Sequence, residues 1–104
     1  MGSDELITVD LGVKRRGLLT ESWLAMFGGW VEALVKGMGG GNMALRGKRP
    51  EVEAFLDTLA REREYANIAA KHGLTDPSVL NNKLQLMKSI ENFERETGII
   101  WPIK

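Results

Sequence analysis

Residues 50–98 read PEVEAFLDTLAREREYANIAAKHGLTDPSVLNNKLQLMKSIENFERETG, a stretch that predicts two long helices joined by a short turn. The first helix is expected over 51–72, because Pro50 has a fixed φ that suits the first helical position. The second is expected over 77–97, because Asp76 is a favoured N-cap residue and a proline follows it. A turn this short makes consecutive helices neighbours, so the stretch predicts a helical hairpin.

Both predicted helices carry an apolar face with helical spacing. The first has a stripe made of Val52, Phe55, Leu56, Leu59, Ala66, Ala69 and Ala70. The second has a broader face made of Val79, Leu80, Leu84, Leu86, Met87, Ile90 and Phe93. Residues three or four apart lie on one side of a helix, so each face can be buried against a neighbouring element.

Upstream of the hairpin, residues 19–36 have the pattern of an amphipathic helix. Thr20 is its predicted N-cap. The pair Gly28-Gly29 costs about 1 kcal/mol per glycine in a helix interior, which indicates a kink or a close approach by another backbone. The glycine-rich segment 37–41 follows and predicts a flexible joint.

Before this helix, residues 7–13 read ITVDLGV and alternate apolar with polar or small residues, which is the two-residue period of a β-strand. A lone strand leaves backbone groups without hydrogen-bond partners. The strand is therefore expected to pair with residues 98–103, or to join a sheet outside this chain. Residues 42–49 are interpreted as an irregular basic loop.

Together these elements predict a mainly α protein with a C-terminal helical hairpin, an N-terminal amphipathic helix and one short β-strand arm. We expect two parts, an interaction arm over 1–41 and a hairpin domain over 42–104. The chain has 104 residues, about one domain in length. Its 43% hydrophobic and 27% charged residues are typical of a folded protein.

The cellular compartment is predicted from three features of the sequence. The chain has no cysteine, which excludes disulfides and thiolate metal sites. Its first residues, MGSDEL, are acidic where a signal peptide has a basic start. The longest uncharged stretch, 22–31, is too short to span a bilayer. We expect a protein of the cytoplasm, or of a particle assembled there.

The charges are balanced along the whole chain, whose formal net charge is zero. Residues 1–48 carry six basic and five acidic side chains, and residues 49–104 carry eight and nine. Neither part has the excess of positive charge that is expected of a strong nonspecific nucleic-acid binder.

Residues 66–83 carry one recognisable motif. Ala69 is a small residue, Gly73 makes a turn four positions later, Leu74 follows it, and Val79 is a further apolar anchor. The motif resembles the helix-turn-helix of many bacterial and phage DNA-binding proteins. The resemblance implies that the second helix reads the major groove through Ser78, Asn81, Asn82 and Lys83.

The same residues also fit a plain helical hairpin. In that interpretation Gly73 caps the first helix, and Asp76-Pro77 starts the next. Residues 66–83 therefore have two interpretations, a helix-turn-helix or a plain helical hairpin. Because the first stays open, a DNA-binding regulator is kept as the alternative function.

Catalytic chemistry has few candidate groups in this chain. His72 is the only histidine, and no cysteine or suitably placed serine is available for it to activate. His72 and Asp76 are two potential metal ligands, too few for a site. The hairpin carboxylates are predicted to lie on solvent faces: Glu51, Glu53, Asp57, Glu62, Glu64, Glu91, Glu94 and Glu96. We expect no enzyme activity, no metal, no cofactor and no small-molecule substrate.

The amphipathic helix is rich in tryptophan and methionine, which are enriched at protein interfaces. It can be the core element of the hairpin, or it can be buried in a partner or in copies of itself. The strand can add to a neighbouring sheet. The leading prediction is a non-enzymatic interaction or assembly protein, for example a structural subunit of a phage virion. Its predicted partner-binding residues are Ile7, Val9, Leu11, Trp23, Phe27, Trp30 and Leu34.

A second alternative is binding to a membrane surface, where tryptophans anchor well. Residues 14–16 (KRR) supply cations before the amphipathic helix. Within the helix, however, Glu21 and Glu32 oppose Lys36, so the helix itself has no cationic face. The membrane surface therefore ranks below a protein partner and below DNA.

Overall fold

The computed structural model describes residues 7–36 and 43–103, and it is mainly helical. The elements follow in the order β1 (Ile7–Asp10), α1 (Glu21–Val35), β2 (Met43–Arg46), α2 (Arg49–His72) and α3 (Pro77–Thr97). This confirms the predicted fold class, a mainly α protein with a C-terminal helical hairpin. The predicted glycine joint over 37–41, and with it the boundary between the two expected parts, lies outside the described residues.

The helix ends form at the residues whose chemistry favours them. Thr20 caps α1, since its hydroxyl oxygen accepts a hydrogen bond from the Trp23 backbone N at 3.0 Å. Asp76 caps α3 by accepting from the Ser78 backbone N at 2.9 Å. Gly98 ends α3 with a φ of +74°, and a Cβ there would lie 2.7 Å from the Lys14 Cγ atom. Both the backbone conformation and the available space therefore require glycine at position 98.

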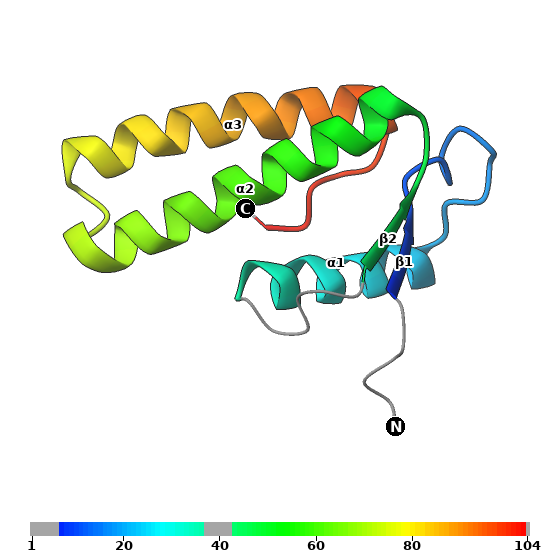
Figure 1. Cartoon of the computed structure of the whole chain (residues 1–104), viewed down its shortest axis with the longest axis horizontal. Coiled ribbons are helices and arrows are strands. Elements are labelled where there is room, and N and C mark those ends of the chain that lie inside the picture. Colours follow the sequence, from blue (N-terminus) through cyan, green and yellow to red (C-terminus); the bar gives the residue numbers. More distant parts are fainter. Residues whose placement is uncertain (1–6, 37–42, 104) are drawn as a thin grey trace.

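Helices α2 and α3 lie side by side and run in opposite directions, and α1 with the two strands covers only one half of this hairpin (Figure 1). The tail after α3 returns along the same covered half. We call residues 49–62 and 89–97 the base of the hairpin and residues 63–88 its tip. The far end of the tip, with the turn between α2 and α3, projects beyond α1 and the tail (Figure 1).

An aromatic cluster forms the centre of the core at the base. It joins Phe27 of α1, Phe55 of α2, Phe93 of α3 and Trp101 of the tail, all fully buried. Their ring centroids lie between 5.1 and 6.3 Å apart. Around them the same core cluster contains Val9, Leu11, Val13, Val31, Leu34, Ala54, Leu59 and Ile99. Because burial of aromatic rings is the largest apolar contribution per residue, this cluster fixes α1 and the tail on the hairpin.

The strands correct two predictions. β1 pairs in parallel with β2, with Ile7 opposite Met43 and Asp10 opposite Arg46. Residues 43–46 are therefore a strand, and the prediction of an irregular loop over 42–49 was wrong for them. The expected pairing of β1 with residues 98–103 was also wrong, because a parallel pair needs a crossover and α1 provides it.

The glycine pair of α1 lies where the tail crosses the helix. A Cβ at Gly28 would lie 3.5 Å from the Pro102 Cβ, whereas a Cβ at Gly29 would meet open space. Helix α1 is continuous over Glu21–Val35. The atom nearest to Gly28 belongs to a proline side chain at ordinary van der Waals distance, so the expected close approach by another backbone is not seen at this pair.

Candidate protein-interaction surface

The seven predicted partner-binding residues occupy different environments. Val9, Leu11 and Phe27 are fully buried within this chain, and Leu34 is buried as well. Trp23 and Trp30 are half-buried. The backbone of Ile7 pairs with Met43, and its side chain lies outside the described part of the structure. In this fold the four buried residues therefore pack against the chain's own hairpin.

The two tryptophans of α1 remain partly open to solvent. Trp23 stacks on Phe27, with ring centroids 5.1 Å apart, and meets Trp30 edge-on at 6.2 Å. Met26, on the same helix between them, is 51% exposed. Trp23 and Trp30 thus pack against the core with part of each side chain accessible, and Met26 adds an exposed apolar side chain beside them.

The residues that the helix-turn-helix resemblance assigns to DNA lie at the start of α3. The Ser78 hydroxyl donates to the Asp76 carboxylate at 2.6 Å, and the Asn82 side-chain amide donates to the Ser78 carbonyl at 3.0 Å. Asn81 and Lys83 are exposed. Helices of a helix-turn-helix cross at about 90–120°, whereas α2 and α3 lie alongside each other (Figure 1). The plain hairpin is the arrangement seen, and DNA binding stays a prediction.

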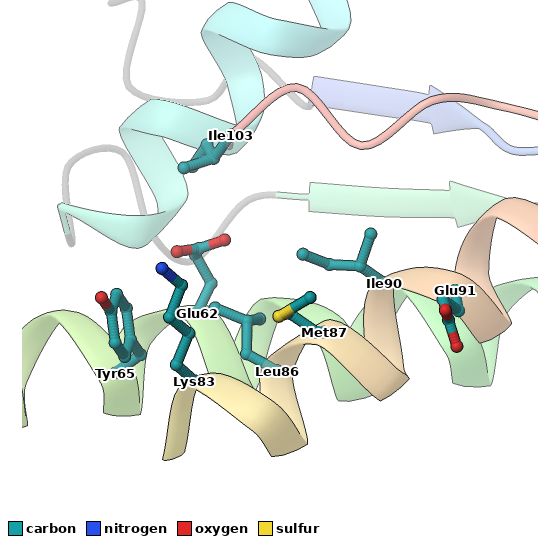
Figure 2. Close-up of a pocket in the computed structure, with 8 residues that line it drawn as sticks. All are labelled: Glu62, Tyr65, Lys83, Leu86, Met87, Ile90, Glu91 and Ile103. Carbon is teal, nitrogen blue, oxygen red and sulfur yellow. The ribbon is translucent and has the colours of Figure 1, made fainter. Parts of the chain in front are cut away.

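A groove of about 390 Å³ lies between the two helices of the hairpin and the end of the tail. Helix α2 contributes Glu62 and Tyr65, and the tail contributes Ile103. Helix α3 contributes Lys83, Leu86, Met87, Ile90 and Glu91. Figure 2 shows Lys83 and Glu91 towards the two ends of the groove, with Leu86, Met87 and Ile90 between them. Most of the lining surface is apolar, and Lys83 and Glu91 stand towards its two ends.

Three large apolar side chains extend this surface along α3. Leu80, Leu84 and Met87 are 49%, 59% and 51% exposed, respectively. Their spacing of four and then three residues places them on one side of the helix. We call these three residues the α3 ridge. The ridge and the groove share Met87, so together they form one largely apolar surface that extends from the tip to the edge of the base.

Glu62 is the one buried carboxyl group that lines the groove. It is 5% exposed, and its Oε1 atom accepts a hydrogen bond from Trp101 Nε1 at 2.9 Å. Burial raises the pKa of Glu62, and the hydrogen bond from Trp101 only partly opposes the rise. Glu62 therefore links α2 to the tail and is also one of the residues that line the groove (Figure 2).

Two of the carboxylates predicted on solvent faces are in fact buried, Glu62 and Glu51. Glu51 accepts a hydrogen bond from the Lys48 backbone N at 2.7 Å and pairs with the Arg15 guanidinium at 3.2 Å. Burial acts to raise the pKa of Glu51, but these hydrogen bonds and positive charges outweigh it and lower the pKa. The prediction was wrong because charge type alone does not show that a carboxylate has buried partners.

A second, smaller groove on the hairpin is acidic. It has a volume of about 260 Å³ and is lined in part by Glu53, Asp57 and Glu96. The Ser89 hydroxyl donates to Asp57 at 2.7 Å, which gives that carboxylate a structural partner. Within residues 7–36 and 43–103, no three potential ligands are grouped so that they could hold a metal ion.

No family model matches this chain, and neither the curated proteins nor the solved structures include one with significant similarity to it. In the part of the chain that the structure describes, no helix has the length and apolar character needed to cross a membrane.

Proposed function

We propose that this chain is a non-enzymatic interaction or assembly protein, which binds an amphipathic helix of another protein chain along the α3 ridge and the adjoining groove. The observation that carries the proposal is the α3 ridge itself: Leu80, Leu84 and Met87 are each about half exposed on one helix face. An apolar stripe with this i, i+4, i+7 spacing is the kind of helix face that a second amphipathic helix packs against.

The energetics favour coverage of this surface. Full burial of a leucine or methionine side chain contributes about 1.5–3 kcal/mol, so covering three half-exposed side chains contributes several kcal/mol before the cost of association. Single exposed apolar residues are ordinary, but three on one face beside an apolar groove form a continuous patch. The charged margins, Lys83 and Glu91, would select the direction of the bound helix.

The outer face of α1 supports the same class of function at a second place. Trp23, Met26 and Trp30 present aromatic and thioether groups, which are types enriched at interfaces. A protein with two accessible apolar faces suits a subunit that contacts more than one neighbour. Incorporation into a larger complex, such as a phage virion, is the most specific form of this proposal.

A titration with a model helix tests the proposal without knowledge of the natural partner. The probe is a synthetic amphipathic peptide with leucines at helical spacing, and the control peptide has the same composition in scrambled order. The ¹⁵N-labelled full chain is expected to show amide shifts in α3 and around Ile103 with the first peptide only. These residues line the groove.

Two variants, each of which replaces one exposed leucine by glutamine, locate the binding surface. Leu84→Gln changes the α3 ridge, whereas Leu56→Gln changes an exposed leucine of α2 that does not line the groove. We expect Leu84→Gln to weaken binding of the model helix about tenfold, which corresponds to about 1.4 kcal/mol. Leu56→Gln should bind like the unaltered chain. Equal binding of both peptides, or equal binding by both variants, would contradict the proposal.

A further inference from the structure

We infer that a second copy of this chain occupies the α3 ridge, with the two α3 helices packed antiparallel about a two-fold axis at Met87. The inference rests on the proposed function, because it names the partner of the same surface. It is carried by the positions of the charged groups that flank the ridge.

Lys83 and Glu91 lie symmetrically about Met87, four residues before it and four residues after it. An α-helix rises 1.5 Å per residue, so each charge is about 6 Å from Met87 along the axis. Both side chains line the same groove as Met87. Two opposite charges therefore lie at equal distances along the helix on either side of Met87, next to the α3 ridge.

A two-fold axis through this residue makes the surface complementary to itself. In an isologous antiparallel pair, a residue four positions before the axis reaches the level of the residue four positions after it in the other copy. Lys83 of each copy then stands level with Glu91 of the other, and Leu84 stands level with Ile90. A parallel pair in the same register would instead bring Lys83 to Lys83 and Glu91 to Glu91, which is repulsive.

Both charges are available for pairing between copies. The ion pairs found among the described residues involve Arg15, Arg16, Arg49 and Arg61, and neither Lys83 nor Glu91 takes part in them. The three ridge residues are exposed, and so are Lys83 and Glu91. Two hairpins can therefore approach to the 8–10 Å between axes that helix packing requires, and their four helices would form a bundle.

The first measurement is the solution mass of the full chain by light scattering over a range of concentrations. We expect a reversible dimer, with a mass that rises towards twice the 11.6 kDa of one chain. Leu84→Gln should raise the dissociation constant of the dimer about tenfold or more, because each dimer loses two apolar contacts. Leu56→Gln is the matched control and should dimerise like the unaltered chain.

Charge reversal then tests the register. Lys83→Glu alone and Glu91→Lys alone each replace two attractive contacts by two repulsive ones, so each should raise the dissociation constant about tenfold. An equimolar mixture of the two variants should recover the dimer, because every cross-contact in the mixed pair is attractive. The double variant Lys83→Glu with Glu91→Lys should also dimerise. Circular dichroism of each variant establishes that it is folded.

The outcomes separate the inference from the proposed function. A chain that stays monomeric at all concentrations, but binds the model helix at the groove, overturns the second copy and leaves the proposed function standing. A monomeric chain that binds no model helix overturns both. A dimer that ignores Leu84→Gln overturns the α3 interface, and failure of the mixed variants to recover the dimer overturns the antiparallel register.

Discussion

The base and the tip of the α2–α3 hairpin consist of the same two helices, yet only the base contributes to the central aromatic cluster of the core. At the base, Phe55 and Phe93 are fully buried beneath α1 and the tail. At the tip, Leu80 and Leu84 are about half exposed, although they belong to the same apolar pattern. One continuous helical pattern therefore supplies core residues at one end of the hairpin and exposed apolar residues at the other.

The base also contains hydrogen bonds that join the two helices to each other and to the tail. At the base, the Thr58 hydroxyl reaches the Ser89 carbonyl across the helix pair at 3.0 Å, and the Ser89 hydroxyl returns a hydrogen bond to Asp57. Trp101 is hydrogen-bonded to both helices. Its ring nitrogen donates to Glu62 of α2, and its backbone nitrogen donates to Glu94 of α3. These buried contacts specify how the base packs, so changes at the base and at the tip should have separable effects.

The largest expected effect is the loss of an aromatic ring at the base. Phe93→Ala should lower the free energy of unfolding by about 3–5 kcal/mol, because it leaves a cavity beside Phe27 and Trp101. Leu84→Ala, a truncation at the tip, should change it by less than about 0.5 kcal/mol when the chain is monomeric. Urea unfolding of both variants measures the contrast. Similar losses for the two would remove the distinction between base and tip.

A smaller loss is expected for the hydroxyl that links the two helices at the base. Thr58→Val keeps the shape of the side chain but removes the hydrogen bond to the backbone carbonyls of Ala54 and Ser89. We expect a loss of about 1–2 kcal/mol, the usual cost of a buried polar group left without its partner. Thr75→Val, at an exposed position of the turn, is the control and should be nearly neutral. A neutral Thr58→Val would show that the link adds no stability.

The cap of α3 should matter mainly for the tip. Asp76→Ala removes the acceptor for the Ser78 backbone N and should cost about 1 kcal/mol or less. Since few other contacts hold the tip, the change should appear first as faster amide hydrogen exchange in the opening turns of α3. The amides of the base should keep their protection. Equal loss of protection at the base would mean that the hairpin opens as one unit.

The smallest effect is a change in the pH dependence of stability at Glu62. Burial raises the pKa of Glu62 above its ordinary value of about 4.3. Between the ordinary and the raised pKa the folded chain binds more protons than the unfolded chain, so this group makes stability fall as pH rises through that window. Glu62→Gln keeps an acceptor for Trp101 but does not titrate, so it should gain stability relative to the unaltered chain as pH rises.

Urea unfolding at several pH values from about 4 to 7 measures this relative gain. Glu96→Gln, an exposed glutamate of α3, serves as the control and should show a much smaller trend. A Glu62→Gln variant whose relative stability stays constant or declines with rising pH would contradict the buried, proton-binding role of this carboxyl group.

Local chemistry made the helices predictable from the sequence. Thr20 and Asp76 are capping residues with few alternatives, and Gly73 and Gly98 end the helices where the apolar periodicity stops. The predicted range 77–97 agrees with α3 at both ends, and 51–72 differs from α2 by two residues at its start. Such signals act between near neighbours, so they can be interpreted without knowledge of the fold.

The features that were missed depend on residues far apart in the chain. β2 has only four residues, and its pairing with β1 exists because α1 carries the chain back across the sheet. Glu62 is buried because Trp101 approaches it from the tail. Phe27 and Leu34 were assigned to a partner because an amphipathic pattern shows that a face is buried and does not show which chain buries it.

The position of Trp101 in the core has a consequence for synthesis of the chain. Val9 and Phe27 are made early, but the tail that completes their core is made after α3. At about 5–20 residues per second, roughly 5–20 s separate the addition of Val9 from that of Trp101. During this interval the aromatic face of α1 has no finished core to enter, so the nascent chain exposes the surface that the completed fold conceals.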